Sequence, residues 1–423
     1  MLKAVLAVAT LFLPAAPALA QAPSCTATGQ ASFVRDTLRE LYLWYRELPD
    51  ANPARYATPE AYLEAVRYRP LDQSFSYITS RAANDAFFSE SQFIGLGLST
   101  TVSGGEMRVL QVFAGSPAEE AGLERGARLE VIGGQAVSAL IDSGGIDTAF
   151  GPAQSGVEVA LEFSRRSGER RSATLRKRAV TIPTVSLTRV FEVDGRKVGY
   201  LFFRNFVRPS VAALDQAFAA LREAGVRELV LDLRYNGGGL VDVAVHLASL
   251  IGGAPLRDQV FAESRHNDRN ARRNETLRFT NPAAALAVER LVVIATRASA
   301  SASELVVNAL RPFMPVVIVG DRTYGKPVGQ YGLPFCDKVF APVAFAMVNA
   351  DGGGDYFAGL PADCVAADDI EHDLGAREET SLAESLRFIA TGTCALPVTT
   401  ARARQDAPLA RRAVGWAALL NAY

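Results

Sequence analysis

The second half of the chain alternates apolar runs with amphipathic stretches, and this alternation restricts the fold more than any other feature of the sequence. From about residue 190 onward, the strand-like runs VGYLFFRNF, ELVLDLR, RLVVIATR and PVVIVGD are separated by SVAALDQAFAALREAG, GGGLVDVAVHLASLIGG and SASELVVNALRPF. Buried strands that alternate with helices are typical of an α/β core. Sites in such cores gather where strands end and helices begin, and the runs NGGG and SASASE lie at two of these junctions.

Residues 30–88 carry a helical pattern instead. ASFVRDTLRELYLWYRELP repeats apolar residues at intervals of three and four, and TPEAYLEAVRY begins with Thr58 as an N-cap and Pro59 at the first helical position. These stretches hold no pattern of catalytic residues. We therefore predict a helical scaffold for this N-terminal region.

Around residue 92 the sequence changes to short alternating runs and glycine turns, FIGLGLSTTVSGGEMRVLQVF, followed by GSPAEEAGLERGARLEVIGGQAV. In the second segment Ser116 can cap a helix that starts at Pro117, Glu119 can complete a capping box, and Gly122 can end the helix. Short strands around such a helix predict a β-rich domain over roughly 90–180.

This combination resembles a PDZ domain in the arrangement found in bacterial proteases. In such domains a GLGL loop turns main-chain N–H groups toward the C-terminal carboxylate of a peptide that adds as an extra strand, and glycine lets the backbone approach the ligand closely. The chain departs from the usual acidic GD at Gly126-Ala127, which touches a turn and not the peptide groove. The resemblance assigns the loop to Gly95, Leu96, Gly97 and Leu98.

The first residues, MLKAVLAVATLFLPAAPALAQ, predict a secretory signal peptide that is cleaved after residue 20. Lys3 precedes an apolar run over 4–13, and small residues occupy 18–20. The unbroken apolar run is about half of the ~20 residues that a membrane-spanning helix needs, and Pro14 and Pro17 interrupt the residues after it. We therefore expect an exported protein, periplasmic or extracellular, without a stable membrane span.

Export places the four cysteines in an oxidising compartment, where disulfides form. Four cysteines permit three pairings. Our interpretation joins Cys336 to Cys364, which staples the loop between them, and Cys25 to Cys394, which ties the start of the mature chain to its end. An alternative for Cys25 is lipid attachment, but the residues before it resemble such a signal poorly.

Composition excludes several other functions. The formal net charge is -1, and no basic stripe interleaved with aromatic residues is present, so neither nucleic acid nor an anionic membrane is an expected partner. The cysteines form no CxxC pair, and the histidines, His246, His266 and His372, are scattered. We predict no metal site and no cofactor.

The run VGDRTYGKPVGQ, residues 319–330, comes close to a phosphate-binding loop, because Gly320, Gly325 and Lys326 fit the pattern G-x-x-x-x-G-K-S/T. Pro327 stands where the pattern needs Ser or Thr, and proline supplies neither a hydroxyl for Mg²⁺ nor an N–H for phosphate. An exported protein would also meet little ATP. We therefore exclude a nucleotide site and look for another role for Lys326.

A serine at the start of a helix offers that role. The run RASASASE, residues 297–304, follows the strand LVVIAT, and small residues around its serines leave a hydroxyl open to substrate beside main-chain N–H groups. A nucleophilic serine needs a base. No histidine has a recognisable triad context and no G-x-S-x-G elbow exists. A lysine desolvated in an apolar pocket is the remaining candidate, since burial lowers its pKa.

With these motifs the sequence resembles the carboxyl-terminal processing (tail-specific) serine protease family over nearly all of the mature chain. The resemblance rests on three ordered motifs: LDLRYNGGG at 231–239, SASASE at 299–304 and VGDRTYGKPVGQ at 319–330. The resemblance implies Ser301 as nucleophile, Lys326, 25 positions later, as general base, and Gln330 as the residue that orients the lysine. It also implies a crotonase/ClpP-like α/β protease core with an N-terminal helical region and an inserted PDZ domain. The family more often has GKGxVQ where this chain has KPVGQ.

In such enzymes the oxyanion donors are main-chain N–H groups of the glycine segment and of the residue after the nucleophile. Here these would be Gly238, chosen among Gly237 to Gly239, and Ala302. We expect Ser299 and Ser303 to cap or pack the helix. Glu304 is expected to be a first-turn acid that the helix dipole favours.

We therefore expect a signal peptide at 1–20, a helical region at 21–89, a PDZ domain at 90–180, a Ser/Lys protease core at 181–395 and a C-terminal helical tail at 396–423. The expected function is that of an exported serine endopeptidase whose PDZ domain binds proteins with exposed apolar C-terminal tails. The alternatives are a non-catalytic binding protein on the same fold and a PDZ-based adaptor. Nothing in the sequence points to an oligomeric state.

Overall fold

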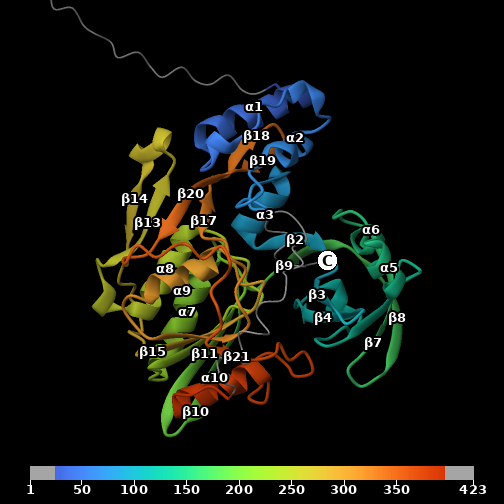
Figure 1. The fold of residues 1–423 in the computed structure, drawn as a ribbon. Coiled ribbons are helices and arrows are strands. Elements are labelled where there is room, and N and C mark those ends of the chain that lie inside the picture. Colours follow the sequence, from blue (N-terminus) through green and yellow to red (C-terminus); the bar gives the residue numbers. More distant parts are fainter. Residues whose placement is uncertain (1–23, 396–423) are drawn as a thin grey trace, which may run out of the picture.

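The computed structural model describes residues 24–395. The predicted signal peptide at 1–20 and the predicted tail at 396–423 lie outside this part of the chain. Within residues 24–395, no helix has both the length and the apolar character that crossing a membrane requires. Figure 1 shows a β-rich unit beside a larger α/β core, with the N-terminal helices α1 and α2 at one end of the core.

The α/β core contains a sheet in which β11, β12, β15, β16 and β21 run parallel, and β10 pairs antiparallel with β11 at one edge. The strands are β10 (Val185–Val193), β11 (Arg196–Phe203), β12 (Glu228–Asp232), β15 (Arg290–Ala295), β16 (Val316–Gly320) and β21 (Cys364–Val365). The strand-helix alternation of the sequence thus produces the predicted α/β core.

Helices cover both faces of this sheet. The helices α7 (Ser210–Glu223), α8 (Val241–Gly252) and α9 (Ala302–Leu310) cover one face, and α10 (Thr380–Thr391) covers the other. Successive residues of a strand point to opposite faces, so Leu229 and Leu231 of β12 pack in the cluster of α7 to α9, whereas Val230 packs with α10. The strands are therefore apolar on both sides, which explains their continuous apolar sequence.

A second sheet stands next to the helical face, in the order β14, β13, β20, β17. Its strands are β13 (Val260–His266), β14 (Glu275–Arg278), β17 (Val328–Gln330) and β20 (Val343–Val348). Since β17 contains Gln330, this sheet positions one of the predicted site residues.

The N-terminal region contains the two helices that its patterns predicted, α1 (Ala27–Leu41) and α2 (Pro59–Val66). It also contains a third helix, α3 (Arg81–Glu90), and a strand, β1 (Tyr77–Ser80), within the region expected to be helical. Thr58 caps α2 through a hydrogen bond from the N–H of Ala61, and Pro59 is its first residue, as predicted. β1 pairs with β19 (Lys338–Ala341), which pairs in turn with β18 (Leu333–Phe335). These pairings fasten the N-terminal region to the core.

The β-rich unit leaves and rejoins the core through two antiparallel strands, β2 (Gln92–Gly95) and β9 (Arg178–Thr181). Its sheet runs in the order β3, β4, β5, β7, β8, so β3 lies at an edge. The remaining elements are β3 (Leu98–Ser103), β4 (Glu106–Val112), α4 (Pro117–Glu120), β5 (Arg128–Ile132), β6 (Gln135–Ala136), α5 (Val137–Ser143), α6 (Ile146–Phe150), β7 (Glu158–Ser164) and β8 (Arg170–Arg176). Ser116 caps α4, as predicted.

The predicted disulfide pairing is wrong, although all four cysteines are oxidised: Cys25 pairs with Cys336, and Cys364 pairs with Cys394. Cys25 precedes α1, which packs beside the turn between β18 and β19 that contains Cys336, and Phe33 of α1 stacks on Phe335. Cys394 follows α10, which packs on the sheet that contains Cys364. Tertiary packing therefore decided the pairing, and chain order did not indicate it.

Candidate active site

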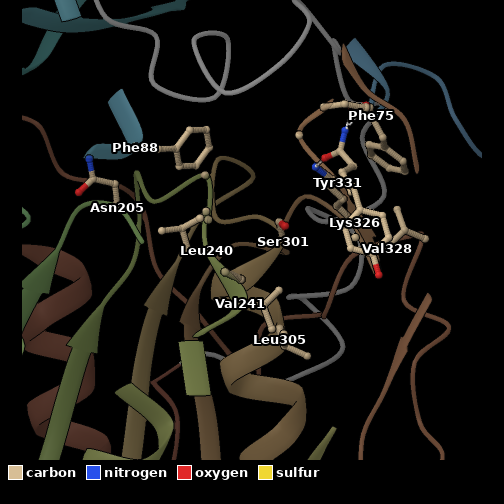
Figure 2. A pocket seen from close by; sticks show the side chains of 18 of the residues that line it. Phe75, Phe88, Asn205, Leu240, Val241, Ser301, Leu305, Lys326, Val328 and Tyr331 are labelled. Atoms are coloured by element: carbon tan, nitrogen blue, oxygen red, sulfur yellow. Dashed lines mark hydrogen bonds between the residues drawn. The ribbon is translucent and has the colours of Figure 1, made fainter. Parts of the chain in front are cut away.

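Ser301 lies between β15 and α9, and its backbone has φ 56° and ψ -113°. A non-glycine residue rarely adopts such a conformation, and strained residues of this kind gather at functional sites. The neighbours Ala300 and Ala302 are buried. Ser301 itself lines a cavity of about 600 Å³, and Figure 2 shows its hydroxyl at the centre of this cavity. The turn thus presents the hydroxyl at a helix N-terminus, where main-chain N–H groups are unpaired.

The glycine run after β12 packs directly on Ser301. A Cβ at Gly238 would lie 2.7 Å from the Ala300 carbonyl oxygen, 2.8 Å from the Ala302 nitrogen and 2.8 Å from Ser301 Cβ. The φ of Gly238 is +93°, a region that side chains disfavour. Glycine is required here because the backbone approaches the serine turn closely.

The predicted oxyanion donors, Gly238 and Ala302, lie next to each other, but their N–H groups are not equally available. The Gly238 N–H donates to Asn236 Oδ1 at 2.9 Å. Within the described residues, the N–H groups of Ala302 and Gly239 have no hydrogen-bond partner. A developing oxyanion would therefore compete with Asn236 for Gly238 or take the neighbouring Gly239 N–H.

Lys326, the predicted base, and Gln330, the residue predicted to orient it, contact each other through their side chains. Lys326 Nζ donates to Gln330 Oε1. The Gln330 Nε2 group donates to the carbonyl oxygens of Phe75, at 2.6 Å, and Ala341, at 2.8 Å. Because these two carbonyls need a donor, the amide nitrogen must face them, and Oε1 must face the lysine.

Gln330 keeps this position even though the local sequence departs from the family pattern. Gly329 of β17 pairs with Phe345 of β20, and a Cβ at Gly329 would lie 2.0 Å from the Phe345 ring. The Pro327 carbonyl accepts a hydrogen bond from the Met347 N–H at 3.0 Å. The second sheet therefore holds the backbone between the lysine and the glutamine in place.

Burial of the amine lowers the pKa of Lys326 from its usual 10.5 to about 8, against the opposing influence of the Asp72 and Glu304 carboxylates. The residue as a whole is partly exposed, while its amine is desolvated. With a pKa of about 8, about a tenth of the lysine is neutral at pH 7. A neutral amine can accept a proton, which is what a general base for serine requires.

Glu304 connects the two loops that contain the serine and the lysine. It is fully buried. Its Oε2 accepts from the main-chain N–H groups of Ser301, at 2.8 Å, and Lys326, at 2.9 Å, and its Oε1 accepts from the Gly325 N–H, at 2.7 Å, and the Thr323 hydroxyl, at 2.5 Å. Burial raises the pKa of this carboxyl, while the four donors favour its ionised form. Glu304 is in the first turn of α9, as predicted, but it does more than complement the helix dipole.

The other two serines of the segment have structural roles, in line with the expectation. The Ser299 hydroxyl donates to the Leu233 carbonyl at 2.7 Å, and the Ser303 hydroxyl donates to the Asn236 carbonyl at 2.9 Å. Both side chains are buried. Ser301 differs from them because its side chain lines the cavity.

The N-terminal region contributes residues to the site, a role that the sequence patterns did not predict. The Phe75 ring lies 5.9 Å from Lys326 Nζ, and its carbonyl holds Gln330. Buried Asp72 shapes this turn, since its carboxylate accepts from the N–H groups of Phe75, at 2.8 Å, and Ser76, at 2.9 Å. The region expected to be scaffold alone thus supplies one wall around the lysine.

Apolar side chains line much of the cavity around Ser301. Figure 2 shows Phe88 and Leu240 on one side of the serine, Lys326 and Tyr331 on the other, and Val241 and Leu305 below it. Further apolar lining comes from Val328, Phe345, Met347 and Tyr356. These walls supply the desolvation that keeps the lysine pKa low.

The predicted carboxylate-binding loop, Gly95 to Leu98, lies in the β-rich unit and does not line this cavity. Its carbonyls are engaged, since Leu96 O accepts from the Ala118 N–H and Gly97 O accepts from the Phe113 N–H, both at 2.9 Å. A Cβ at Gly97 would lie 2.0 Å from Ser116 Cβ. The loop is therefore packed against the N-terminus of α4 and continues into the edge strand β3.

The comparisons with known proteins agree on one family. The model of "Peptidase family S41" matches residues 197–365, and that of the "Peptidase S41 N-terminal domain" matches residues 29–77. A chloroplastic C-terminal processing peptidase of Tetradesmus obliquus is 31% identical over 62% of this chain and 57% of its own length. The carboxy-terminal processing protease CtpA of Bacillus subtilis is 24% identical over 62% of this chain and 53% of its own length. The chain thus spans little more than half the length of these relatives.

Solved structures give the same result for the fold. A Bacteroides fragilis protein described as an S41 protease superimposes with a TM-score of 0.69 at 26% identity, over 85% of this chain and 97% of its own. A photosystem II D1 C-terminal processing protease superimposes with a TM-score of 0.51 at 22% identity, over 80% of this chain and 92% of its own. The second likeness concerns the fold alone.

Proposed function

Because the chain belongs to peptidase family S41, we propose that it is an exported serine endopeptidase of the C-terminal processing type, with Ser301 as nucleophile and Lys326 as general base. One observation carries this proposal. The amine of Lys326 lines the same cavity as Ser301, is fixed by Gln330, and has a pKa lowered to about 8. A lysine of this kind can work as a base near neutral pH.

The chemistry follows from these groups. As Ser301 Oγ attacks the scissile carbonyl carbon, its proton passes to Lys326 Nζ, and the carbonyl oxygen becomes an oxyanion beside the Ala302 N–H and the glycine turn. The intermediate collapses, the C–N bond breaks, and the protonated lysine gives its proton to the departing amine. Water then attacks the acyl ester, transferring its proton to Lys326, and the new carboxyl terminus leaves as Ser301 regains its hydrogen. Each cycle returns both residues to their starting states.

We further propose that the β-rich unit is a PDZ domain, over roughly 90–180, that captures apolar C-terminal tails of protein substrates. Two observations support this. β3 lies at the edge of its sheet, which is where a peptide can add as a strand. Gly97 adopts φ +89° against Ser116, so the loop needs glycine in the position that the resemblance assigns to carboxylate binding.

The proposed location is periplasmic or extracellular. The chain is expected to begin with a signal peptide, and the described residues contain two disulfides, which persist in oxidising compartments. The proposed domain bounds, with a protease core over 181–395, follow the points where the chain passes through β2 and β9.

The test uses purified protein and an unfolded protein substrate with an apolar C-terminus. Ser301→Ala and Lys326→Ala should each abolish cleavage, while the exposed controls Ser167→Ala and Lys197→Ala should cleave at the wild-type rate. A serine-reactive acylating probe should label the wild type and not Ser301→Ala. Wild-type cleavage by Ser301→Ala would overturn the assignment, and binding without any cleavage by the wild type would favour a non-catalytic protein.

A further inference from the structure

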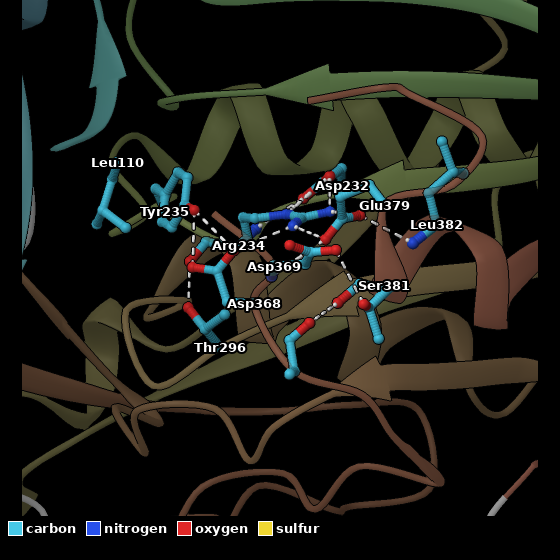
Figure 3. Close-up of polar contacts among 12 residues, drawn as sticks. Leu110, Asp232, Arg234, Tyr235, Thr296, Asp368, Asp369, Glu379, Ser381 and Leu382 are labelled. Atoms are coloured by element: carbon cyan, nitrogen blue, oxygen red, sulfur yellow. Dashed lines mark hydrogen bonds and ion pairs between the residues drawn. The ribbon is translucent and has the colours of Figure 1, made fainter. Parts of the chain in front are cut away.

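The β-rich unit reaches into the core at Tyr235, the residue just before Asn236 of the glycine turn. Arg125 follows α4 of the β-rich unit and is only 7% exposed. It donates from Nη1 to the Tyr235 hydroxyl at 2.7 Å and from Nη2 to Asp368 Oδ1 at 3.0 Å. Figure 3 shows Tyr235 and Asp368 beside Arg234 in this polar network. A buried residue of one unit thus contacts a buried tyrosine next to the proposed oxyanion turn.

Tyr235 is held at both ends. Its hydroxyl donates to the Asp368 carboxylate, with distances of 2.8 and 2.7 Å to the two oxygens, while it accepts from Arg125. Its carbonyl accepts from Arg204, a fully buried side chain that also donates to Gln111 Oε1 of β4 at 3.2 Å. The β-rich unit therefore contacts the tyrosine directly through Arg125 and, with Gln111, supports the arginine at its carbonyl.

The ion pairs around this tyrosine share partners, and Arg234, Asp232 and Glu379 are fully buried, whereas Asp368 is partly exposed. Arg234 contacts Asp232, Asp368 and both carboxylate oxygens of Glu379, the latter at 2.7 and 2.9 Å. Neighbouring guanidinium groups hold the pKa of Asp368 below its ordinary value. A buried charge that loses its partner is strongly destabilised, so the network has one favoured arrangement.

Tyr235 is connected to the turn of the nucleophile through the next residue, Asn236. The next residue, Asn236, accepts at its carbonyl from the Ala300 N–H at 3.0 Å and at its side chain from the Gly238 N–H. The close approach of Gly238 to Ser301 leaves no room for the turn to move toward the serine. A displacement of Tyr235 would therefore move the turn relative to Ser301.

We propose that Arg125 and Tyr235 are positioning residues for the oxyanion turn, residues 236–239, so that the β-rich unit is part of the support of the catalytic site. This inference rests on the proposed function. It predicts that breaking the contact between Arg125 and Tyr235 slows the chemical step without weakening substrate binding. Oxyanion donors contribute to the transition state more than to the ground state, and removing one lowers kcat by about 10² to 10³.

Two other ion pairs between the same units provide matched controls. Arg108 contacts Glu371 at 2.6 Å, and Arg166 contacts Asp373 at 2.8 Å, both at partly exposed positions. Each pair joins the β-rich unit to the core without contacting Tyr235. A role in holding the units together would be shared by all three arginines, whereas a role in positioning the turn belongs to Arg125.

The experiment measures kcat and KM of the full chain on a short peptide substrate, together with the rate of labelling by a serine-reactive probe. Arg125→Gln and Tyr235→Phe should each lower kcat and the labelling rate by about tenfold or more, with KM within about twofold of wild type. Arg108→Gln and Arg166→Gln should change neither. Tyr235→Phe removes a single oxygen and keeps the ring, so it is the decisive variant if Arg125→Gln does not fold.

The outcomes are distinguishable. A wild type that neither cleaves nor becomes labelled contradicts the proposed function. An active wild type whose kcat survives Tyr235→Phe unchanged overturns this inference alone, as does an equal loss in Arg108→Gln and Arg125→Gln. A rise in KM with kcat unchanged would also overturn it, because that pattern belongs to substrate binding.

Discussion

The main-chain N–H of Lys326 donates to Glu304 at 2.9 Å, onto the carboxylate oxygen that also accepts from the Ser301 N–H at 2.8 Å. The loops of the proposed base and nucleophile are therefore joined through one atom of a fully buried side chain. Since both contacts are made by main chain, they fix the backbones of the two loops without engaging the Ser301 hydroxyl or the Lys326 amine.

Replacing Glu304 should test this connection. In Glu304→Gln an NH₂ group takes the place of one oxygen, so two of the four donors lose their acceptor. Each buried donor left without a partner costs about 1–3 kcal/mol, so we expect the free energy of unfolding to fall by about 2–6 kcal/mol. We also expect kcat to fall by at least about tenfold, because the two loops separate.

Denaturant unfolding and steady-state kinetics measure these two effects. Glu223→Gln, at the exposed end of α7, is the matched control and should change neither. Wild-type stability in Glu304→Gln would show that the carboxylate is not needed to hold the loops.

The lowered pKa of Lys326 predicts a pH dependence of activity. The base works only when neutral, so kcat/KM should rise with pH and level off above about 8. A pH–rate profile between pH 6 and 10 measures this. Gln330→Ala removes the side chain that fixes the amine and should lower kcat. A profile that is flat across this range, or that falls as pH rises through 8, would contradict Lys326 as the base.

Stability should also rise with pH because of the same lysine, but over a higher pH range than activity. The unfolded chain holds the proton up to about pH 10.5 and the native protein only up to about 8, so burial of the charge destabilises the protein fully below pH 8 and this penalty fades between 8 and 10.5. At about 1.4 kcal/mol per pH unit, the penalty at pH 7 is at most about 3 kcal/mol. Lys326→Met removes it but leaves Gln330 Oε1 unpaired.

We therefore expect Lys326→Met to be inactive and about 1–2 kcal/mol more stable than wild type at pH 7, with an advantage that shrinks as pH rises to 10. Denaturant unfolding at both pH values measures this. A variant that is less stable than wild type at pH 7 would show that the charged amine is well solvated in the native protein.

Local sequence predicted much of the fold and of the site. The strand-helix alternation predicted the α/β core, because continuous apolar strands need cover on both faces. Ser301, Lys326 and Gln330 come from short motifs, and in the structure all three line one cavity. Ser301 directly precedes α9, Lys326 lies just before β17, and Gln330 ends β17. These residues could be proposed from the sequence because each belongs to a short motif.

Contacts between distant segments could not be predicted in this way. Phe75 holds Gln330 across 255 positions of sequence, and neither Phe75 nor Asp72 belongs to a motif. Glu304 had one visible sign, an acid three positions after the nucleophile, but its four donors come together only when the loop of Lys326 folds over the helix. The error in the disulfides has the same origin, because helix packing chose the partners.

The disulfide between Cys25 and Cys336 joins α1 to the turn between β18 and β19, on the side of the core that places Phe75 beside Lys326. Removing a native disulfide from a small secreted domain typically costs about 2–5 kcal/mol. We expect the double variant Cys25→Ser with Cys336→Ser to lose stability in this range. It should also lose activity at temperatures well below the unfolding of the core, because the N-terminal region separates first and releases Gln330.

Mass spectrometry of an unreduced digest should recover Cys25 with Cys336 and Cys364 with Cys394 as linked peptides. Activity and thermal unfolding of the double variant are then followed on the same sample, with Cys364→Ser and Cys394→Ser as the comparison, since that bond fastens α10 on the opposite face of the sheet. Loss of the second disulfide should lower stability while activity follows global unfolding. If both double variants lost activity equally far below their unfolding temperatures, a specific role for the N-terminal region at the lysine would be contradicted.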